Sequence, residues 1–153
     1  MKNNQCEISF YHLSKQPVTK ALPKLLEKIY QSGLKSLVIC NSDSEMTALN
    51  EVIWTFASKS FLPHSSIKEP FPELQPILLT TSSHNINHSD VIIILSGIIP
   101  ENINEFKRCL DMFYGSKGDE TVTQAQNRHA TYKENGYTLA YWTQIDDGSW
   151  VSS

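Results

Sequence analysis

The sequence predicts a single three-layer α/β domain over residues 1–153, with a mostly parallel sheet, helices on both faces of the sheet and a C-terminal β-hairpin. Strand-like and helix-like segments alternate along most of the chain, which is typical of a parallel sheet between helices. Two short, nearly all-apolar segments, Lys35–Cys40 and Val91–Leu95, suit strands that are covered on both faces. The pair Asp147-Gly148 is a turn signal that favours a hairpin at the end.

The first part of the chain predicts a strand, a helix and a second strand. Residues 6–13 mix Ile, Phe and Tyr and indicate the first strand. Apolar residues then recur at helical spacing over residues 21–30, and Gly33 is a natural end for that helix. Because proline has no N–H group to donate, we expect Pro23 in the first turn. Residues 35–40 follow as the second strand.

A second helix is expected after this strand. Ser42 and Glu45 form a capping-box pattern, in which the two side chains satisfy free N–H groups at the start of a helix. Apolar residues follow on one helix face over residues 46–56. Trp54 lies about 100° round the helix from Ile53, so we expect its side chain at the edge of this face or outside it.

The middle of the chain predicts a loop, two strands and a third helix. Residues 65–76 contain three prolines and indicate a loop, after which residues 76–80 suit a short strand. The polar residues 81–89 predict turns, and residues 91–95 give the strongest strand signal of the chain. Pro100 is expected to open a helix. The inward-facing residues of that helix would be Ile103, Phe106, Leu110 and Phe113.

The C-terminal part predicts one more helix and the closing hairpin. Gly115 and Gly118 bound a loop, and a helix is expected from about residue 119 to residue 135, with Gly136 as its cap. Residues 137–145 alternate between apolar and polar side chains, which indicates a strand of the hairpin.

The composition is that of a soluble globular protein. Of 153 residues, 40% are hydrophobic and 19% charged, which fits one ordinary domain. The three cysteines are far apart and odd in number, which argues for a reducing compartment. We see no signal peptide, and the most apolar segment, Val91–Ile99, is far shorter than the ~20 residues that cross a bilayer. We therefore expect a cytoplasmic protein without membrane contact.

The charge totals limit direct binding to nucleic acid. Thirteen Lys and Arg stand against sixteen Asp and Glu, a formal net charge of −3. Proteins that neutralise many phosphates usually have a basic excess or a basic stripe. We therefore expect any contact with DNA to be mostly indirect.

Signals for catalysis, cofactors and metals are weak. The first strand–helix turn, Ser14–Pro17, has no glycine, and no Gly-Lys-Ser or Gly-Lys-Thr sequence occurs, so we expect no nucleotide cofactor. His84 and His88 have the spacing of helical metal ligands but lie in a predicted loop, so no metal is expected. Cys40, at the end of a predicted strand, is a candidate nucleophile, although a cysteine there more often packs as a small apolar side chain.

Two segments, residues 49–64 and residues 128–142, combine aromatic and basic side chains. Trp, Tyr and Arg are enriched where protein surfaces bind partners. Trp54 is the best candidate for an exposed aromatic because its helix has an apolar face without it. His64 suits either a hydrogen-bonding or stacking role beside Trp54 or a plain capping role. Aromatic side chains flanked by cations such as Arg128 suit an acidic or C-terminal peptide.

These segments resemble the chi subunit of bacterial DNA polymerase III. The resemblance is clearest in Leu49-Asn50-Glu51-x-x-Trp54 followed by Ser60-Phe61-Leu62-Pro63-His64. It continues in Arg128-x-x-x-Tyr132-Lys133-x-x-Gly136-Tyr137, in Tyr141-Trp142-Thr143-Gln144 and in Asp146-Asp147-Gly148-x-Trp150. It covers nearly the whole chain and is specific in only two or three of these patches.

The resemblance implies a small Rossmann-like accessory subunit that has no catalytic residues and no cofactor. Chi proteins link the clamp loader to single-stranded DNA-binding protein by holding the acidic C-terminal tail of that protein. In some bacteria, chi also pairs with a second small subunit, psi. The resemblance further implies a single peptide-binding site on this chain. Its residues would be Trp54, Phe61, His64, Arg128, Tyr132 and Lys133.

One departure and two alternatives remain. Members of the family carry more basic side chains and an aromatic on the last helix, where this chain has Val122, Gln126, His129 and Ala130. Fewer cations predict weaker attraction for an acidic tail. One alternative hypothesis is a small α/β enzyme that uses Cys40 as nucleophile. The other is direct binding of single-stranded nucleic acid through stacked aromatic side chains.

Overall fold

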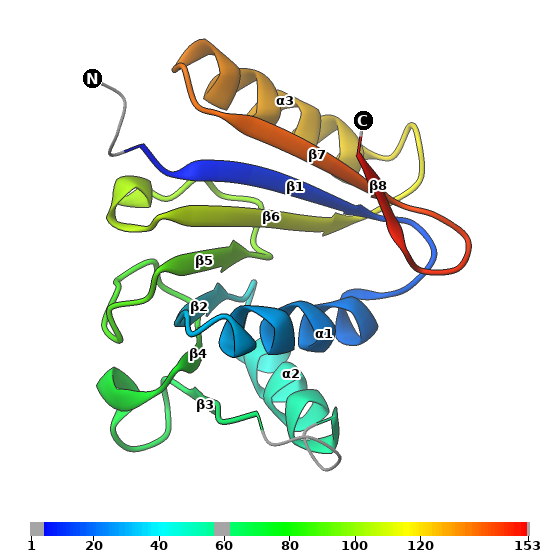
Figure 1. Ribbon diagram of the computed structural model, residues 1–153. Coiled ribbons are helices and arrows are strands. Elements are labelled where there is room, and N and C mark those ends of the chain that lie inside the picture. The colour runs from blue at the N-terminus through cyan, green and yellow to red at the C-terminus, as the bar shows by residue number, and fades with distance from the viewer. Residues whose placement is uncertain (1–4, 57–61, 153) are drawn as a thin grey trace.

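The computed structural model describes residues 5–56 and 62–152 (Figure 1). The strands are Glu7–Leu13 (β1), Ser36–Ile39 (β2), Ser65–Ser66 (β3), Ile77–Thr80 (β4), Val91–Ile94 (β5), Arg108–Tyr114 (β6), Leu139–Gln144 (β7) and Trp150–Ser152 (β8). The α-helices of the described residues are Val18–Gln31 (α1), Asp43–Phe56 (α2) and Glu120–Glu134 (α3). Short 3-10 turns lie at Pro72–Leu74 and Ile103–Glu105.

The strands form one sheet in the order β3-β4-β2-β5-β6-β1-β7-β8. The pairs from β3 to β7 are parallel, and β7 pairs with β8 in antiparallel register. The predicted three-layer α/β fold with a closing hairpin is therefore confirmed (Figure 1).

Two apolar cores lie on opposite faces of the sheet. One core joins the sheet to α1 and α2 through side chains such as Leu26 and Ile53. The other joins the opposite face to α3 through side chains such as Ala125 and Tyr132. Successive residues of β6 alternate between the two cores, because side chains of a strand point to opposite faces in turn. Leu110 and Met112 belong to the first core, and Cys109 and Phe113 to the second.

The helix predicted from Pro100 is wrong. Residues 103–105 form a 3-10 turn, and residues 108–114 form β6, which lies in the middle of the sheet between β5 and β1. A strand buried on both faces has no alternation to identify it, and its apolar residues happen to match helical spacing.

Three local features differ in detail from the expectations. The helix α1 begins at Val18, so Pro23 lies in its second turn. The Ser42 hydroxyl accepts the N–H of Glu45 at 3.1 Å, as the capping box predicts, but the Glu45 carboxylate accepts the N–H of Asn41 at 2.7 Å. Within the predicted loop 65–76, the first two residues pair with β4 as β3.

The loop before α1 is held by the closing hairpin. The buried side chain of Gln144 accepts the N–H groups of Lys15 at 3.1 Å and of Gln16 at 2.9 Å. The C-terminal hairpin thus fixes where α1 begins, although the two segments are far apart in sequence. None of the helices in the described ranges is long and apolar enough to cross a membrane.

Candidate functional site

The helix α2 directs Trp54 away from the core. Ile53, the preceding residue, is completely buried, whereas the Trp54 side chain is 55% exposed. The indole packs on the imidazole of His64, with 4.6 Å between ring centroids and 53° between ring planes. The expectation that Trp54 lies outside the apolar face, beside His64, is confirmed. We call the exposed indole of Trp54 with His64 beneath it the Trp54 surface.

Backbone carbonyl groups hold His64 in place. Its Nδ1 lies 2.9 Å from the carbonyl oxygen of Leu62, and its Nε2 lies 3.3 Å from that of Asn50 on α2. The Asn50 amide donates to the Glu69 carboxylate at 3.1 Å, which also accepts the N–H of Ser66 at 2.9 Å. The imidazole is therefore a rigid, buried support for the indole above it. Phe61, which was predicted to flank the same site, lies outside the described residues.

Arg128 is buried in an ion pair and does not face solvent. Its guanidinium donates from Nε to one Asp111 carboxylate oxygen at 2.7 Å and from Nη2 to the other at 2.9 Å. Arg128 is only 8% exposed and Asp111 1%. Burial raises the pKa of Asp111, and the hydrogen bond and charge of Arg128 offset part of this rise. The charge of Arg128 is therefore already used inside the protein, and its expected contact with a peptide stays a prediction.

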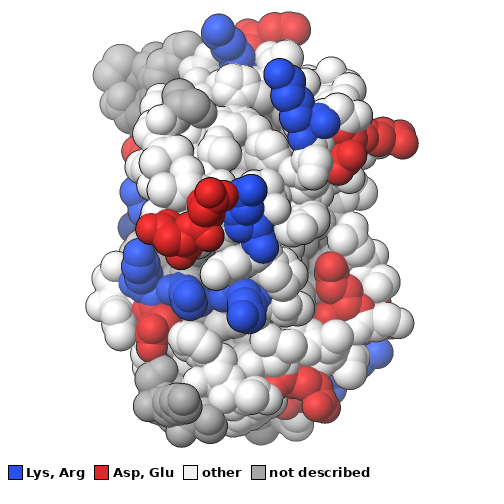
Figure 2. Space-filling view, turned by 90° about the vertical axis from the view of Figure 1, so that its right-hand side faces the viewer, with Lys and Arg blue, Asp and Glu red and all other residues white. Residues whose placement is uncertain are grey.

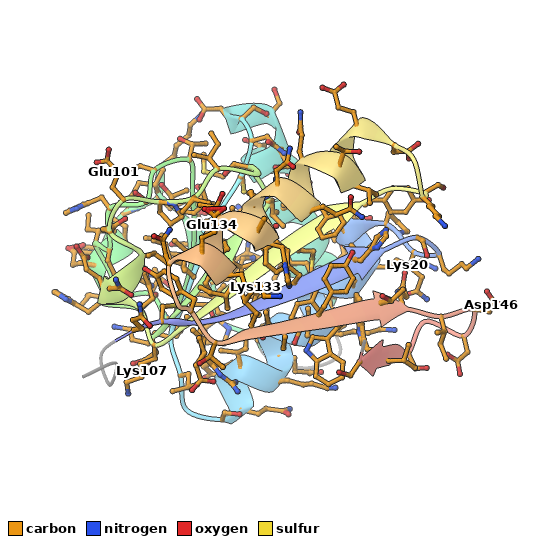
Figure 3. All side chains as sticks on the ribbon, turned by 90° about the horizontal axis from the view of Figure 1, so that it is seen from above. Lys20, Glu101, Lys107, Lys133, Glu134 and Asp146 are labelled. Atoms are coloured by element: carbon orange, nitrogen blue, oxygen red, sulfur yellow. The ribbon has the colours of Figure 1, made fainter. Side chains whose placement is uncertain are left out.

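Tyr132 is also part of the core, whereas Lys133 is exposed. Tyr132 is 1% exposed, and its ring lies against Phe10 at 6.0 Å and Tyr137 at 5.4 Å between centroids. Burial, followed by the nearby Cys109, raises the pKa of its hydroxyl. Tyr132 therefore packs as a core side chain, and its expected contact with a peptide stays a prediction. Lys133 lies in the last turn of α3 and is exposed (Figure 3).

The structure does not bring the predicted residues together. Trp54 and His64 belong to the side of the sheet covered by α1 and α2, and Arg128, Tyr132 and Lys133 belong to α3 on the other side. The described residues that the resemblance assigns to one site therefore lie in two separate regions. Sequence spacing could not show this, because the face on which a helix packs depends on the strand order.

Cys40 is poorly suited to nucleophilic catalysis. It is 2% exposed, and burial, with a smaller contribution from Glu45, raises the pKa of its thiol to about 12. The thiolate is the reactive form, so this environment opposes the chemistry that the alternative enzyme hypothesis requires. Cys6 and Cys109 are buried as well.

The remaining candidates form no recognisable metal site. His84 and His88 lie in the turn between β4 and β5, as expected. The described residues contain no cluster of three or more His, Cys, Asp or Glu side chains that could hold a metal ion.

Comparisons with known proteins match most of the chain. A family model described as "DNA polymerase III chi subunit, HolC" matches residues 6–140. A "Probable DNA polymerase III subunit chi" from Rickettsia prowazekii (strain Madrid E) is 34% identical over 107 residues, which cover 70% of this chain and 65% of that protein. The chain thus spans slightly less than two thirds of this relative. A "DNA polymerase III subunit chi" from Haemophilus influenzae is 27% identical over 117 residues, covering 76% of this chain and 80% of that protein.

Among solved structures, "The crystal structure of T4 UvsW" is similar in fold. The superposition has a TM-score of 0.67 and covers 92% of this chain and 42% of that one, at 10% sequence identity. At this identity the likeness concerns the α/β fold alone.

Proposed function

This chain belongs to the DNA polymerase III chi subunit family, and from that premise we propose that it is a non-catalytic accessory subunit of the cytoplasmic replication machinery. In this proposal, it links the clamp loader to single-stranded DNA-binding protein by binding the acidic C-terminal tail of that protein. A link of this kind raises the effective concentration of the polymerase assembly at DNA that is already coated.

The observation that supports a linking role is the separation of the candidate surfaces. A protein that bridges two partners needs two surfaces that do not overlap. The Trp54 surface lies beside α2 and β3, and a row of exposed lysines, Lys20, Lys24 and Lys28, lies along α1. One partner can therefore bind without covering the surface that the other needs.

The Trp54 surface suits a folded partner better than an acidic tail. The hydrogen bonds that fix His64 and its neighbours involve Asn50, Ser66 and the Glu69 carboxylate, and the charge among them is negative. A large exposed indole on a rigid support is the kind of side chain that contributes most to protein–protein binding. We therefore assign the Trp54 surface to the clamp-loader side, either directly or through a psi-like subunit.

Replacing Trp54 with alanine is expected to weaken binding to the purified clamp-loader complex of the source cell by about thirtyfold or more. This corresponds to the ~2 kcal/mol lost when an interface aromatic of this kind is truncated. Biolayer interferometry with the immobilised chain measures the change. Tyr114→Ala is the matched control, because Tyr114 is 50% exposed at the end of β6. Equal affinities for the wild type and Trp54→Ala would remove this assignment.

The linking role itself predicts a ternary complex. A fluorescent peptide that copies the last ten or so residues of the source cell's single-stranded DNA-binding protein should bind the chain at low salt. It should stay bound, with unchanged anisotropy-derived affinity, when saturating clamp-loader complex is added. Competition between the two would show that they share one surface, and lack of peptide binding to the wild type would contradict the proposed tail binding.

A further inference from the structure

A hollow lies between α1 and α2 on the side of the molecule away from α3. Its volume is about 490 Å³, within the usual range of ligand-binding clefts. We call it the α1–α2 hollow. Its apolar walls are Pro23, Val52 and Phe56, and its polar rim consists of Gln16, Thr19, Lys20, Lys24 and Thr55.

The cations of this hollow belong to a row on α1. Lys20, Lys24 and Lys28 follow at four-residue spacing, so they share one face of the helix, and all three are exposed. The ion pairs between described residues use other cations, namely Lys15, Lys68, Lys107 and Arg128. The first turn of α1 has no acidic residue, although Glu27 lies further along the helix. In Figure 2 a short row of Lys and Arg side chains lies below the middle of the face, with acidic side chains directly above it.

A second hollow lies between α1 and the closing hairpin. It has a volume of about 370 Å³, shares Gln16 and Lys24 with the α1–α2 hollow, and reaches Lys28 and Trp150. From Lys20 to Lys28 the helix rises by about 12 Å. An extended peptide covers this distance with about four residues. The row of lysines is therefore long enough for a short peptide, with one hollow towards α2 and one towards the closing hairpin.

Pro23 removes one helical backbone donor at the edge of the hollow. A residue at position 23 of a regular helix donates its N–H to the carbonyl of Thr19, but proline has no N–H. Both residues line the α1–α2 hollow. The Thr19 carbonyl therefore lacks its usual helical donor, and a backbone N–H of a bound peptide can supply one.

The charges and shape of this surface favour an acidic peptide over nucleic acid. Binding of single strands relies on many cations along the backbone and on open aromatic faces. Here the chain has a net charge of −3, and Phe56 and Trp150 are both partly buried. Two ammonium groups beside an apolar hollow instead fit alternating carboxylates and one apolar side chain.

We propose that Lys20 and Lys24 bind the carboxylates of an acidic peptide whose apolar side chain enters the hollow between Pro23, Val52 and Phe56. This rests on the proposed function, and the peptide is then the acidic tail of single-stranded DNA-binding protein. The tail site is thus on α1, apart from both the Trp54 surface and α3.

The test compares two double variants of equal charge. Lys20→Ala/Lys24→Ala should weaken binding of the fluorescent tail peptide by about tenfold at low salt, because two charge-assisted contacts are lost. Lys117→Ala/Lys133→Ala lowers the net charge by the same amount and removes the exposed cation of α3, and it should change the affinity less than about twofold. Trp54→Ala should bind the peptide like the wild type. Thermal unfolding followed by circular dichroism verifies that each variant is folded.

The outcomes separate this inference from the proposed function. If the wild type does not bind the peptide, the proposed tail binding fails. If the wild type binds but Lys20→Ala/Lys24→Ala binds equally well, or if both double variants weaken equally, the α1 site is wrong and tail binding survives. Loss of peptide binding in Trp54→Ala would show that the tail binds beside α2 and not on α1. If binding of an oligothymidine requires Lys20 and Lys24 and binding of the peptide does not, the ligand of this surface is nucleic acid instead.

Discussion

Arg128→Met is expected to lower the free energy of unfolding by about 3–5 kcal/mol at pH 7. The substitution leaves the Asp111 carboxylate, which is 1% exposed, buried without its partner, and an uncompensated buried charge costs about this much. Urea unfolding measures the change. Lys133→Met, on the exposed side of the same helix, is the matched control and should change stability by less than about 0.5 kcal/mol.

The stability loss of Arg128→Met should depend on pH in a definite direction. Burial raises the pKa of Asp111, and Arg128 opposes that rise, so removal of Arg128 raises the pKa further. The folded variant then binds a proton more tightly than the unfolded chain does. The loss of unfolding free energy in Arg128→Met should be largest when the pH is above the pKa of Asp111 in the folded variant. It should shrink as the pH falls through this pKa and the carboxyl group becomes neutral. Comparison of wild type and variant at pH 7 and at pH 5 tests the direction.

A double variant distinguishes the effect of an unpaired buried carboxylate from the effect of lost side-chain packing. Arg128→Met/Asp111→Leu removes both charges and should recover most of the stability, because a buried ion pair is often replaceable by apolar side chains. A single variant as stable as the wild type would contradict the buried pair. An equally destabilised double variant would show that packing, and not the unpaired carboxylate, causes the defect.

Tyr132→Ala is expected to cost about 3–5 kcal/mol of unfolding free energy, the usual cost of deleting a large aromatic from a core. The ring is 1% exposed and packs between α3 and the sheet, against Phe10 and Tyr137. The same urea experiment measures the loss. A loss below about 1 kcal/mol would contradict the buried position.

Tyr132→Phe is the control for the hydroxyl group. Among the described residues, this buried hydroxyl has no partner of full hydrogen-bond geometry and interacts only with the Cys109 thiol, a weak partner, so its removal should change stability by less than about 1 kcal/mol. If Tyr132 contacted a peptide through its hydroxyl, Tyr132→Phe would instead weaken peptide binding at constant stability. The pair of variants thus separates a core role from a binding role.

Much of the fold was predictable because its signals are local. The apolar segments at Ser36–Ile39 and Val91–Ile94, the cap at Ser42 and the turn at Gly148 all lie within a few residues of what they determine. The exposed position of Trp54 also followed from local spacing, since the helix has an apolar face without it. The strand at residues 108–114 was not predicted, because a strand that is covered on both faces shows no alternation of apolar and polar side chains.

The candidate site was predictable only in part. Trp54 and His64 are ten residues apart and meet through one short connection, so the motif that contains both was informative. Arg128 looked like a free cation because Asp111, its partner, seemed to belong to a helix. The row Lys20, Lys24 and Lys28 was visible in the sequence as a four-residue repeat, but the hollow beside it requires α2 to pack next to α1.

The sequence by itself determined the α/β class, most of the strands and helices, the family and the exposure of one tryptophan. The tertiary structure decided which helices share a face of the sheet, and so placed Arg128 and Tyr132 in the core on the side opposite Trp54. The reason is that spacing along the chain encodes local conformation, whereas contacts between distant elements depend on the order in which the strands pair.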